Sequence, residues 1–112
     1  MAERPPRLEG KVAIVTGAGS SGEGVGNGKA ASILFAREGA KVLLVDFQEG
    51  RARETLQVIQ DEGGVASTLQ GDMTKLEDCE RMAQTAMERY GRVDILDNNV
   101  GVSQRGTVVE VS

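Results

Sequence analysis

Two uninterrupted aliphatic runs limit what this chain can fold into more than any other feature of its sequence. The first covers residues 12–15 and the second residues 42–45, and neither alternates with polar residues. A strand that is apolar on both sides must be covered on both faces, which is the usual situation in a parallel sheet. Each run is far shorter than the roughly 20 apolar residues that span a bilayer. The sequence therefore predicts buried parallel strands.

Helical patterns separate these runs from two weaker ones, at residues 65–69 and 93–96. The first helix is predicted around residues 30–37, and the second ends at the glycine pair 63–64. The third starts at a capping box, Thr74 to Glu77, and stops at Gly91. Its apolar face is expected to pack in the core and consists of Leu76, Cys79, Met82, Ala83, Ala86, Met87 and Tyr90.

The alternation of strands and helices predicts one α/β domain. Four strands linked by three helices give a parallel sheet with right-handed crossovers. A chain of 112 residues fits a single domain. We expect a polar lead-in over residues 1–10 and the domain over residues 11–112.

A glycine-rich segment connects the first strand to the first helix. Residues 17–28 contain six glycines. Glycine lets the backbone turn tightly and approach phosphates, and a helix start supplies free N–H groups. Such a loop can also be an ordinary connection, but Asp46 ends the second strand near the roughly 20-residue offset of a ribose-binding acid. Together these features predict a site for an adenine dinucleotide.

The residues around Asp46 favour NAD over NADP. Its carboxylate oxygens can accept the 2′- and 3′-hydroxyls of a ribose, whereas they would repel a 2′-phosphate. Phe47 rather than an arginine follows the acid, and residues 17–28 contain neither Lys nor Arg.

Four motifs in this order and spacing resemble the short-chain dehydrogenase/reductase (SDR) family. Asp46 is one of them. The glycine segment, from Thr16-Gly17 to Gly26-Asn27-Gly28, resembles the family's Thr-Gly-x-x-x-Gly-x-Gly element. Asp72-Met73 resembles its Asp-Val pair, and residues 98–101 resemble its Asn-Asn-Ala-Gly element. The resemblance covers the chain from about Leu8 onward.

The resemblance implies a Rossmann-type doubly wound parallel sheet, of which this chain would be the N-terminal half with strand order 3-2-1-4. It implies NAD(P)-dependent hydride transfer between an alcohol and a carbonyl compound. The implied cofactor contacts are Gly17, Gly26, Asn27 and Gly28 at the pyrophosphate, Asp46 at the ribose, Asp72 and Met73 at the adenine, and Asn99 beside the cofactor. Phe47, which follows Asp46, is a further candidate cofactor contact.

The chain departs from the family pattern in two places. Eight residues rather than three separate Gly17 from Gly26, which changes the set of amides that can meet the phosphates. Val100 replaces the usual alanine, a small increase in bulk near the cofactor.

The family's catalytic Ser, Tyr and Lys find no match here. The one tyrosine, Tyr90, is followed four residues later by Asp94 rather than by the lysine of Tyr-x-x-x-Lys. We therefore expect a cofactor-binding fragment that is inactive alone, with the catalytic, substrate-binding and oligomer-forming residues downstream. Residues 101–112 look like a cut end, so the fragment is also expected to be poorly soluble or partly unfolded.

Composition argues against several other functions. A net charge of −4 disfavours binding to nucleic acid or to anionic membranes. The absence of histidine removes His-based catalysis and His-containing metal sites. A single cysteine, Cys79, allows no internal disulfide, and the N-terminus lacks the apolar segment of a signal peptide. These features predict a cytoplasmic location.

Two other functions stay open. An S-adenosylmethionine-dependent methyltransferase could use the Gly-x-Gly-x-Gly match at residues 24–28, although its loop should follow the strand directly. A stand-alone module that binds or senses NAD without catalysis would need only the predicted cofactor site.

Overall fold

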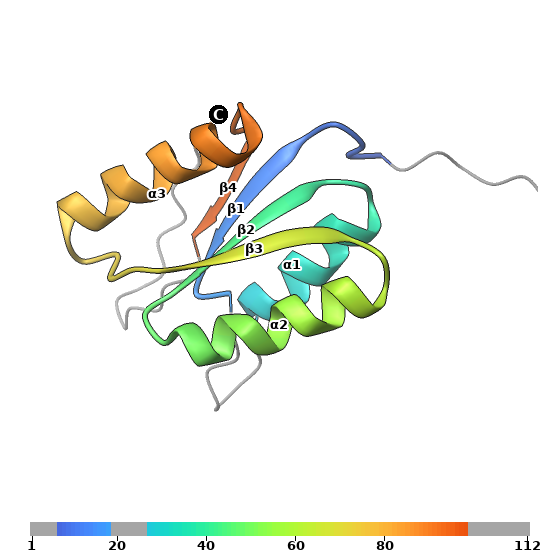
Figure 1. Cartoon of the computed structure of the whole chain (residues 1–112), viewed down its shortest axis with the longest axis horizontal. Helices are drawn as coiled ribbons and strands as arrows, with labels where there is room; N and C mark the ends of the chain where they lie inside the picture. Colours follow the sequence, from blue (N-terminus) through green and yellow to red (C-terminus); the bar gives the residue numbers. More distant parts are fainter. Residues whose placement is uncertain (1–6, 19–26, 99–112) are drawn as a thin grey trace, which may run out of the picture.

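The computed structural model describes residues 7–18 and 27–98, which form a four-stranded parallel sheet flanked by helices (Figure 1). The strands are β1 (Val12–Thr16), β2 (Lys41–Asp46), β3 (Val65–Gln70) and β4 (Ile95–Asn98). The helices are α1 (Asn27–Arg37), α2 (Glu49–Asp61) and α3 (Leu76–Tyr90). The order across the sheet is β3-β2-β1-β4, which confirms the predicted α/β class and strand order.

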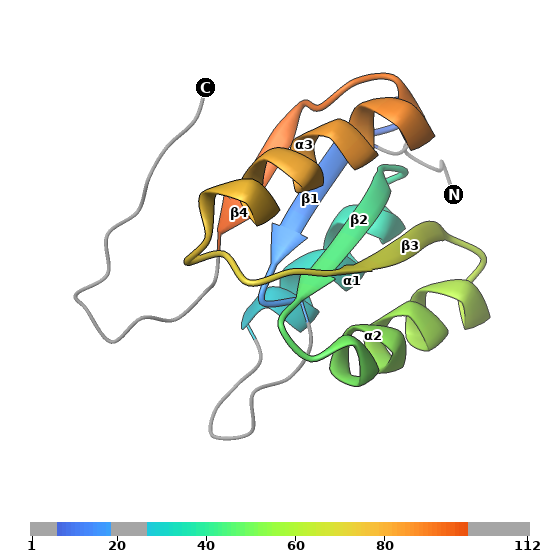
Figure 2. The ribbon, with the colours of Figure 1, turned by 60° about the vertical axis from the view of Figure 1, so that its left-hand side comes forward.

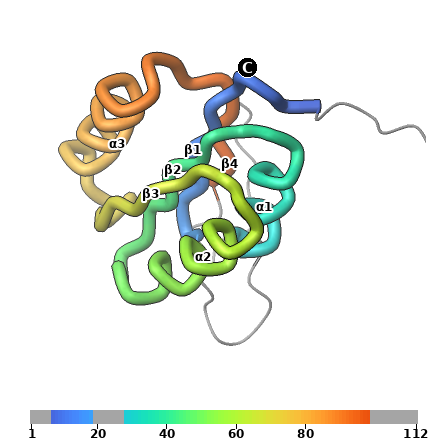
Figure 3. The backbone as a smooth tube through the Cα atoms, turned by 45° about the vertical axis from the view of Figure 1, so that its right-hand side comes forward, coloured from blue at the N-terminus to red at the C-terminus, as the bar shows by residue number. Residues whose placement is uncertain are grey.

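The helices lie in two layers, one on each face of the sheet. Helices α1 and α2 cover one face and α3 covers the other (Figures 2 and 3). Because successive side chains of a strand point to opposite faces, Val42 and Leu44 pack in the core of the α1–α2 side. Leu43 and Val45 pack in the core of the α3 side. This run is buried throughout, as its unbroken apolar sequence predicts.

The core of the α1–α2 side extends to the N-terminal end of the described chain. Leu8 packs against it, and the Leu8 amide donates to the Glu38 carbonyl at 2.7 Å. The Lys11 amide in turn donates to the Leu8 carbonyl at 2.9 Å. Residues 7–10, in the expected lead-in, are thereby tied to the end of α1.

Helix α3 presents a narrower apolar face to the sheet than the sequence predicts. Met82 and Ala86 are buried, one turn apart, and Tyr90 packs against the same core. Ala83 and Met87 each follow a buried residue by one position, about 100° round the helix, and are exposed. Leu76 is 73% exposed and Met87 52%. The prediction that these three pack in the core is wrong, because one helix can turn only one stripe toward the sheet.

Both predicted glycine stops are confirmed. Gly63 and Gly91, which follow α2 and α3, have φ angles of +87° and +83°, a left-handed conformation that favours glycine. The predicted capping box at the start of α3 is wrong. The N-cap residue is Lys75 rather than Thr74, and no side chain bonds to the helix at this position.

Within the described part of the chain, we find no helix with the length and apolar character needed to cross a membrane.

Candidate functional site

The carboxyl ends of the strands bring the predicted site residues to one edge of the sheet. Thr16 pairs with Val45 on one side and with Asn98 on the other, and Asp46 pairs with Gln70. Strand β1 also marks the point where the chain changes direction across the sheet, from β1-β2-β3 to β4. In open α/β sheets, ligands bind at the carboxyl ends of the strands beside such a switch point.

The glycine turn, which we define as Gly17-Ala18 together with the first turn of α1, is held by backbone contacts and by one buried side-chain hydroxyl. Gly17 has a φ of +65°. A Cβ at Gly28 would overlap the Gly17 carbonyl, so glycine alone lets α1 start this close to β1. The Ala18 amide donates to the Val45 carbonyl at 3.1 Å, and the buried Thr55 hydroxyl donates to the Ala18 carbonyl at 2.9 Å.

The described residues thus include both ends of the glycine-rich segment. Gly17 lies at its start, and Gly28 lies in α1 at its end. Asn27 is the first residue of α1, and its side chain, like Gly26 and Asn99, lies outside what the structure describes.

Asp46 ends β2 directly beside the glycine turn, because Ala18 bonds to the residue before it. One carboxylate oxygen of Asp46, Oδ1, accepts the Gln48 amide at 2.8 Å and so turns the chain toward α2. Phe47, between them, is 62% exposed. The half-buried acid therefore has a fixed direction at the edge of the sheet.

The Asp72 turn, residues 71–74, follows β3 on the outer side of Asp46. Asp72 Oδ1 accepts the Thr74 hydroxyl at 2.6 Å and the Thr74 amide at 3.0 Å. These two hydrogen bonds lower the pKa of the Asp72 carboxyl below its ordinary value, the hydroxyl contact contributing most. The Thr74 hydroxyl is therefore used inside the turn, which explains why it does not cap α3. Met73 packs against the α3-side core.

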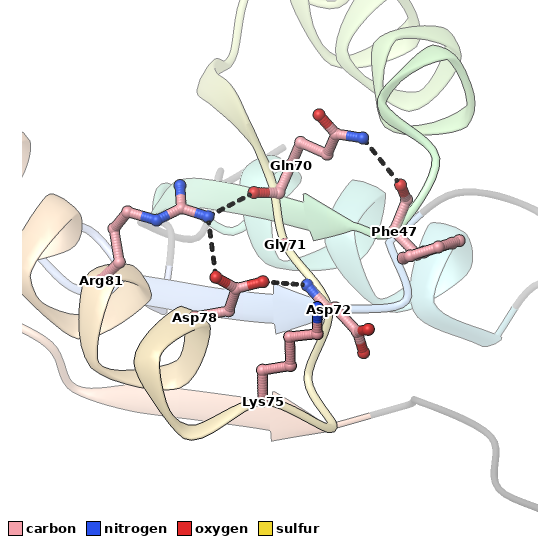
Figure 4. A pocket seen from close by; sticks show the side chains of 7 residues that line it. All are labelled: Phe47, Gln70, Gly71, Asp72, Lys75, Asp78 and Arg81. Atoms are coloured by element: carbon pink, nitrogen blue, oxygen red, sulfur yellow. Dashed lines mark hydrogen bonds and ion pairs between the residues drawn. The ribbon is translucent and has the colours of Figure 1, made fainter.

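A pocket of about 230 Å³ lies at the outer end of this edge (Figure 4). It joins the end of β2 to the end of β3 and the start of α3, and is lined by Phe47, Gln70, Gly71, Asp72, Lys75, Asp78 and Arg81. Phe47 and Asp72 were predicted from the sequence, whereas the other five were not. A usable signal was the three-residue spacing of Lys75, Asp78 and Arg81, which places polar groups on one side of a helix start.

A second contact that the sequence does not reveal links β1 to β4. The hydroxyl of Thr16, which is buried, donates to Asn98 Oδ1 at 2.6 Å. This bond ties the two strands at the end where the glycine turn begins. Both residues belong to motifs that the sequence singles out, but their direct contact could be found only from the pairing of β1 with β4.

Comparisons with known proteins agree with this geometry. The chain matches the family model of the short chain dehydrogenases over residues 11–112. An oxidoreductase of Thermotoga maritima is 41% identical over 105 residues, which cover 94% of this chain and 39% of the relative. A short-chain dehydrogenase/reductase homolog of Bacillus subtilis, YusS, is 38% identical over 96 residues, which cover 84% of this chain and 83% of YusS.

A solved structure is similar in fold as well as in sequence. The crystal structure of a short-chain dehydrogenase/reductase from Burkholderia xenovorans superposes with a TM-score of 0.82 at 44% identity. The match covers 90% of this chain and 40% of that one, so this chain spans about two fifths of the Thermotoga and Burkholderia proteins. The family model and these relatives show that the chain belongs to the short chain dehydrogenase family of oxidoreductases.

Proposed function

We propose that this chain binds NAD and forms the cofactor-binding part of a dehydrogenase that moves a hydride between NAD and an alcohol or carbonyl substrate. One observation carries the proposal: the Ala18 amide of the glycine turn bonds to the residue before Asp46. A diphosphate site and an acid for the neighbouring ribose therefore stand side by side. When bound, the nicotinamide supplies the hydride chemistry, and this chain supplies binding and orientation.

The glycine turn is assigned to the pyrophosphate. The first amides of a helix have no partner within it, and they carry the positive end of its dipole. The close approach of Gly28 to Gly17 places the start of α1 directly over the end of β1. We assign the pyrophosphate contacts to Gly17, Gly26, Asn27 and Gly28, and a further cofactor contact to Asn99.

Asp46 and Phe47 are assigned to the adenosine ribose. A carboxylate has about four acceptor positions, so the bond from the Gln48 amide to Oδ1 is compatible with accepting sugar hydroxyls. The same charge would repel a 2′-phosphate, which is why we propose NAD rather than NADP. The exposed Phe47 ring offers an apolar wall beside the sugar and lines the neighbouring pocket.

Asp72 and Met73 are assigned to the adenine. The bonds from Thr74 keep the Asp72 carboxylate ionised and directed, so it can accept an amino group. Met73 is partly buried and packs against the α3-side core, which anchors the turn. A purine would therefore meet a polar group and an apolar wall at this end of the edge.

The catalytic acid/base is proposed to lie outside these 112 residues. The hydroxyl of Tyr90 is 2.7 Å from the Ser67 hydroxyl, and its ring packs against the α3-side core. Tyr90 also ends α3 just before β4, at the edge of the sheet opposite the site. We propose that residues 11–112 belong to one NAD-binding domain. The cytoplasmic location stays a prediction.

A titration of the whole chain with NADH and NADPH tests the proposal, using NADH fluorescence or calorimetry. We expect saturable binding that is tighter for NADH. Asp46→Ala should weaken NADH binding about tenfold, since it removes a charged hydrogen-bond acceptor, and should narrow the difference between the cofactors. Glu54→Ala, which removes an exposed carboxylate from α2, is the matched control and should change neither value.

Two results would contradict the proposal. If the folded chain binds neither cofactor, the NAD assignment is wrong. If Asp46→Ala keeps the full preference for NADH, the ribose role of Asp46 is wrong. Only the assignment of the glycine turn to the pyrophosphate would then remain.

A second candidate function is NAD binding by this chain without catalysis. Its specific support is YusS. This chain covers 83% of that relative, so the family includes a protein of nearly the same length as this chain. Incubation with NAD and simple secondary alcohols, followed by NADH absorbance, tests what the two functions share, which is that this chain alone does not catalyse hydride transfer. Sustained turnover by the chain alone would contradict both the non-catalytic module and the assignment of the catalytic groups to residues outside it.

A further inference from the structure

The turn that follows β3 is held from outside by two charged residues of α3. Asp78 Oδ2 accepts the Asp72 amide at 2.8 Å. Arg81 donates from Nη2 to Asp78 Oδ1 and to the Gln70 carbonyl, both at 3.2 Å. Figure 4 shows the Asp78 carboxylate between the Arg81 guanidinium and the Asp72 backbone. The residue before the turn and the residue within it are thus fixed by the same pair.

We propose that Asp78 and Arg81 are positioning residues that set the direction of the Asp72 turn and thereby the affinity of the site for adenine. The inference rests on the proposed function, in which Asp72 and Met73 receive the adenine. Neither Asp78 nor Arg81 need touch the cofactor for this role.

The position of Asp78 in α3 supports a role beyond helix capping. Asp78 is the third residue of the helix, where an acidic side chain ordinarily bonds back to the amide of the N-cap residue. Here it reaches past the N-cap, Lys75, to the amide of Asp72, six residues upstream. The N-cap itself has no side-chain bond. The acid therefore stabilises the turn before the helix rather than the helix end.

The surroundings of the turn leave little room for another arrangement. A Cβ on the buried Gly71 would lie 3.1 Å from Met73 Cε and 3.5 Å from Val45 Cγ1. On the inner side the Gly71 amide donates to the Asp46 carbonyl at 3.1 Å. The turn is thus fixed to the ribose-binding acid on one side and to Asp78 on the other.

The charges around Asp78 keep it in the accepting form. The hydrogen bond from the Asp72 amide lowers the pKa of the Asp78 carboxyl, and the bond from Arg81 lowers it further. Lys75 acts in the same direction, while burial opposes it. Because an ionised carboxylate donates no proton, both of its oxygens can accept the two contacts at neutral pH.

The test measures binding of two probe ligands to the whole chain by calorimetry: ADP-ribose, which carries adenine, and nicotinamide mononucleotide, which does not. Asp78→Ala should weaken ADP-ribose binding about tenfold, and Asp78→Asn, which keeps one acceptor oxygen, should weaken it less. The affinity for nicotinamide mononucleotide should not change in either variant, whereas a general loss of structure would lower the affinities for both ligands.

Arg89→Gln is the matched control. Arg89 also joins α3 to β3, through its bonds to the Ser67 hydroxyl at 2.9 Å and the Thr68 carbonyl at 3.1 Å, but it lies near the C-terminal end of α3 and contacts the middle of β3, away from the Asp72 turn. It should leave both affinities unchanged. A direct readout is the backbone amide of Asp72 in an NMR spectrum, which should shift and exchange faster with solvent in Asp78→Asn.

The outcomes separate this inference from the function on which it rests. A folded wild-type chain that binds neither probe overturns the proposed function and the adenine role with it. A wild-type chain that binds ADP-ribose with an affinity that Asp78→Asn leaves unchanged overturns only the positioning role. If Asp78→Ala fails to fold, Asp78→Asn and the Asp72 amide still decide the question.

Discussion

The two turns that flank the site at the carboxyl edge are held in different ways. The glycine turn is fixed by uncharged groups: Gly28 leaves just enough space for the Gly17 carbonyl, and the Thr55 hydroxyl donates to the Ala18 carbonyl. The Asp72 turn is fixed by side chains, the Thr74 hydroxyl within it and the Asp78 carboxylate outside it. The first arrangement tolerates no added atom, whereas the second depends on charge. The glycine turn, which we assign to the pyrophosphate, should therefore be insensitive to pH, and the Asp72 turn, which we assign to the adenine, should respond to acid.

The largest expected effect is that of Gly28→Ala on the glycine turn. The added Cβ would meet the Gly17 carbonyl, which is backbone and cannot rotate away, so we expect a loss of about 1–3 kcal/mol in the free energy of unfolding. NADH binding should fall with it. Urea denaturation followed by circular dichroism measures the stability.

Gly50→Ala is the control for that change. Gly50 lies in the first turn of α2, and a Cβ there would meet nothing within 4 Å. This substitution should stabilise the helix by up to about 1 kcal/mol. Equal stabilities for the two variants would show that the glycine turn is looser than its geometry implies.

A smaller effect is expected for the support beneath the glycine turn. Thr55 is fully buried and its hydroxyl donates to the Ala18 carbonyl, so Thr55→Val should lower the free energy of unfolding by about 1–2 kcal/mol. Ser32→Ala removes an equally buried hydroxyl that bonds only within α1, to the Gly28 carbonyl. Ser32→Ala should lower the free energy of unfolding less than Thr55→Val, because Gly28 stays in the hydrogen-bonded backbone of α1. Thermal unfolding of both variants gives the comparison, and the reverse order would contradict it.

The smallest effect is the response of the Asp72 turn to acid. Hydrogen bonds lower the pKa of the Asp72 carboxyl, chiefly those from Thr74, and that of the Asp78 carboxyl, chiefly that from the Asp72 amide. A lowered folded-state pKa means stabilisation that is present above the ordinary value of about 3.9 and is lost as the pH falls through the lower folded values.

NMR can separate the two turns in one acid titration. The amides of Asp72 and Thr74 should hold their chemical shifts down to about pH 4 and move below it. The Ala18 amide, which bonds to a backbone carbonyl, should move only with global unfolding. Simultaneous movement of all three amides in a chain that is still folded would mean that the turns do not differ.

The sequence predicts the sheet and its edge well, for a physical reason. The run Val42–Val45 fits a strand buried on both faces, and Gly63 and Gly91 mark helix ends through conformations that other residues rarely adopt. These signals are local, so they can be read without knowing what packs against them. The position of Asp46 at the end of β2 follows from the same run.

The predictions that fail concern side chains with a choice of partner. Thr74 has the spacing of a capping residue, but Asp72 lies two positions before it and takes the hydroxyl. Met82 and Met87 are equally apolar, yet only Met82 faces the sheet. The role of Asp78 cannot be predicted from the sequence, because it depends on how close the start of α3 lies to the end of β3 in the folded chain. Sequence spacing fixes which residues are candidates, and tertiary packing decides between them.

The most direct measurement is an NMR titration of the amide-labelled chain with NADH. If the cofactor binds at the carboxyl edge, the amides of Gly17, Ala18, Asp46 and Asp72 should shift in a saturable way. The amides of Gly63 and Gly91, at the opposite edge of the sheet, should stay in place. Shifts confined to that opposite edge, or none in a folded chain, would contradict the assignment of the site.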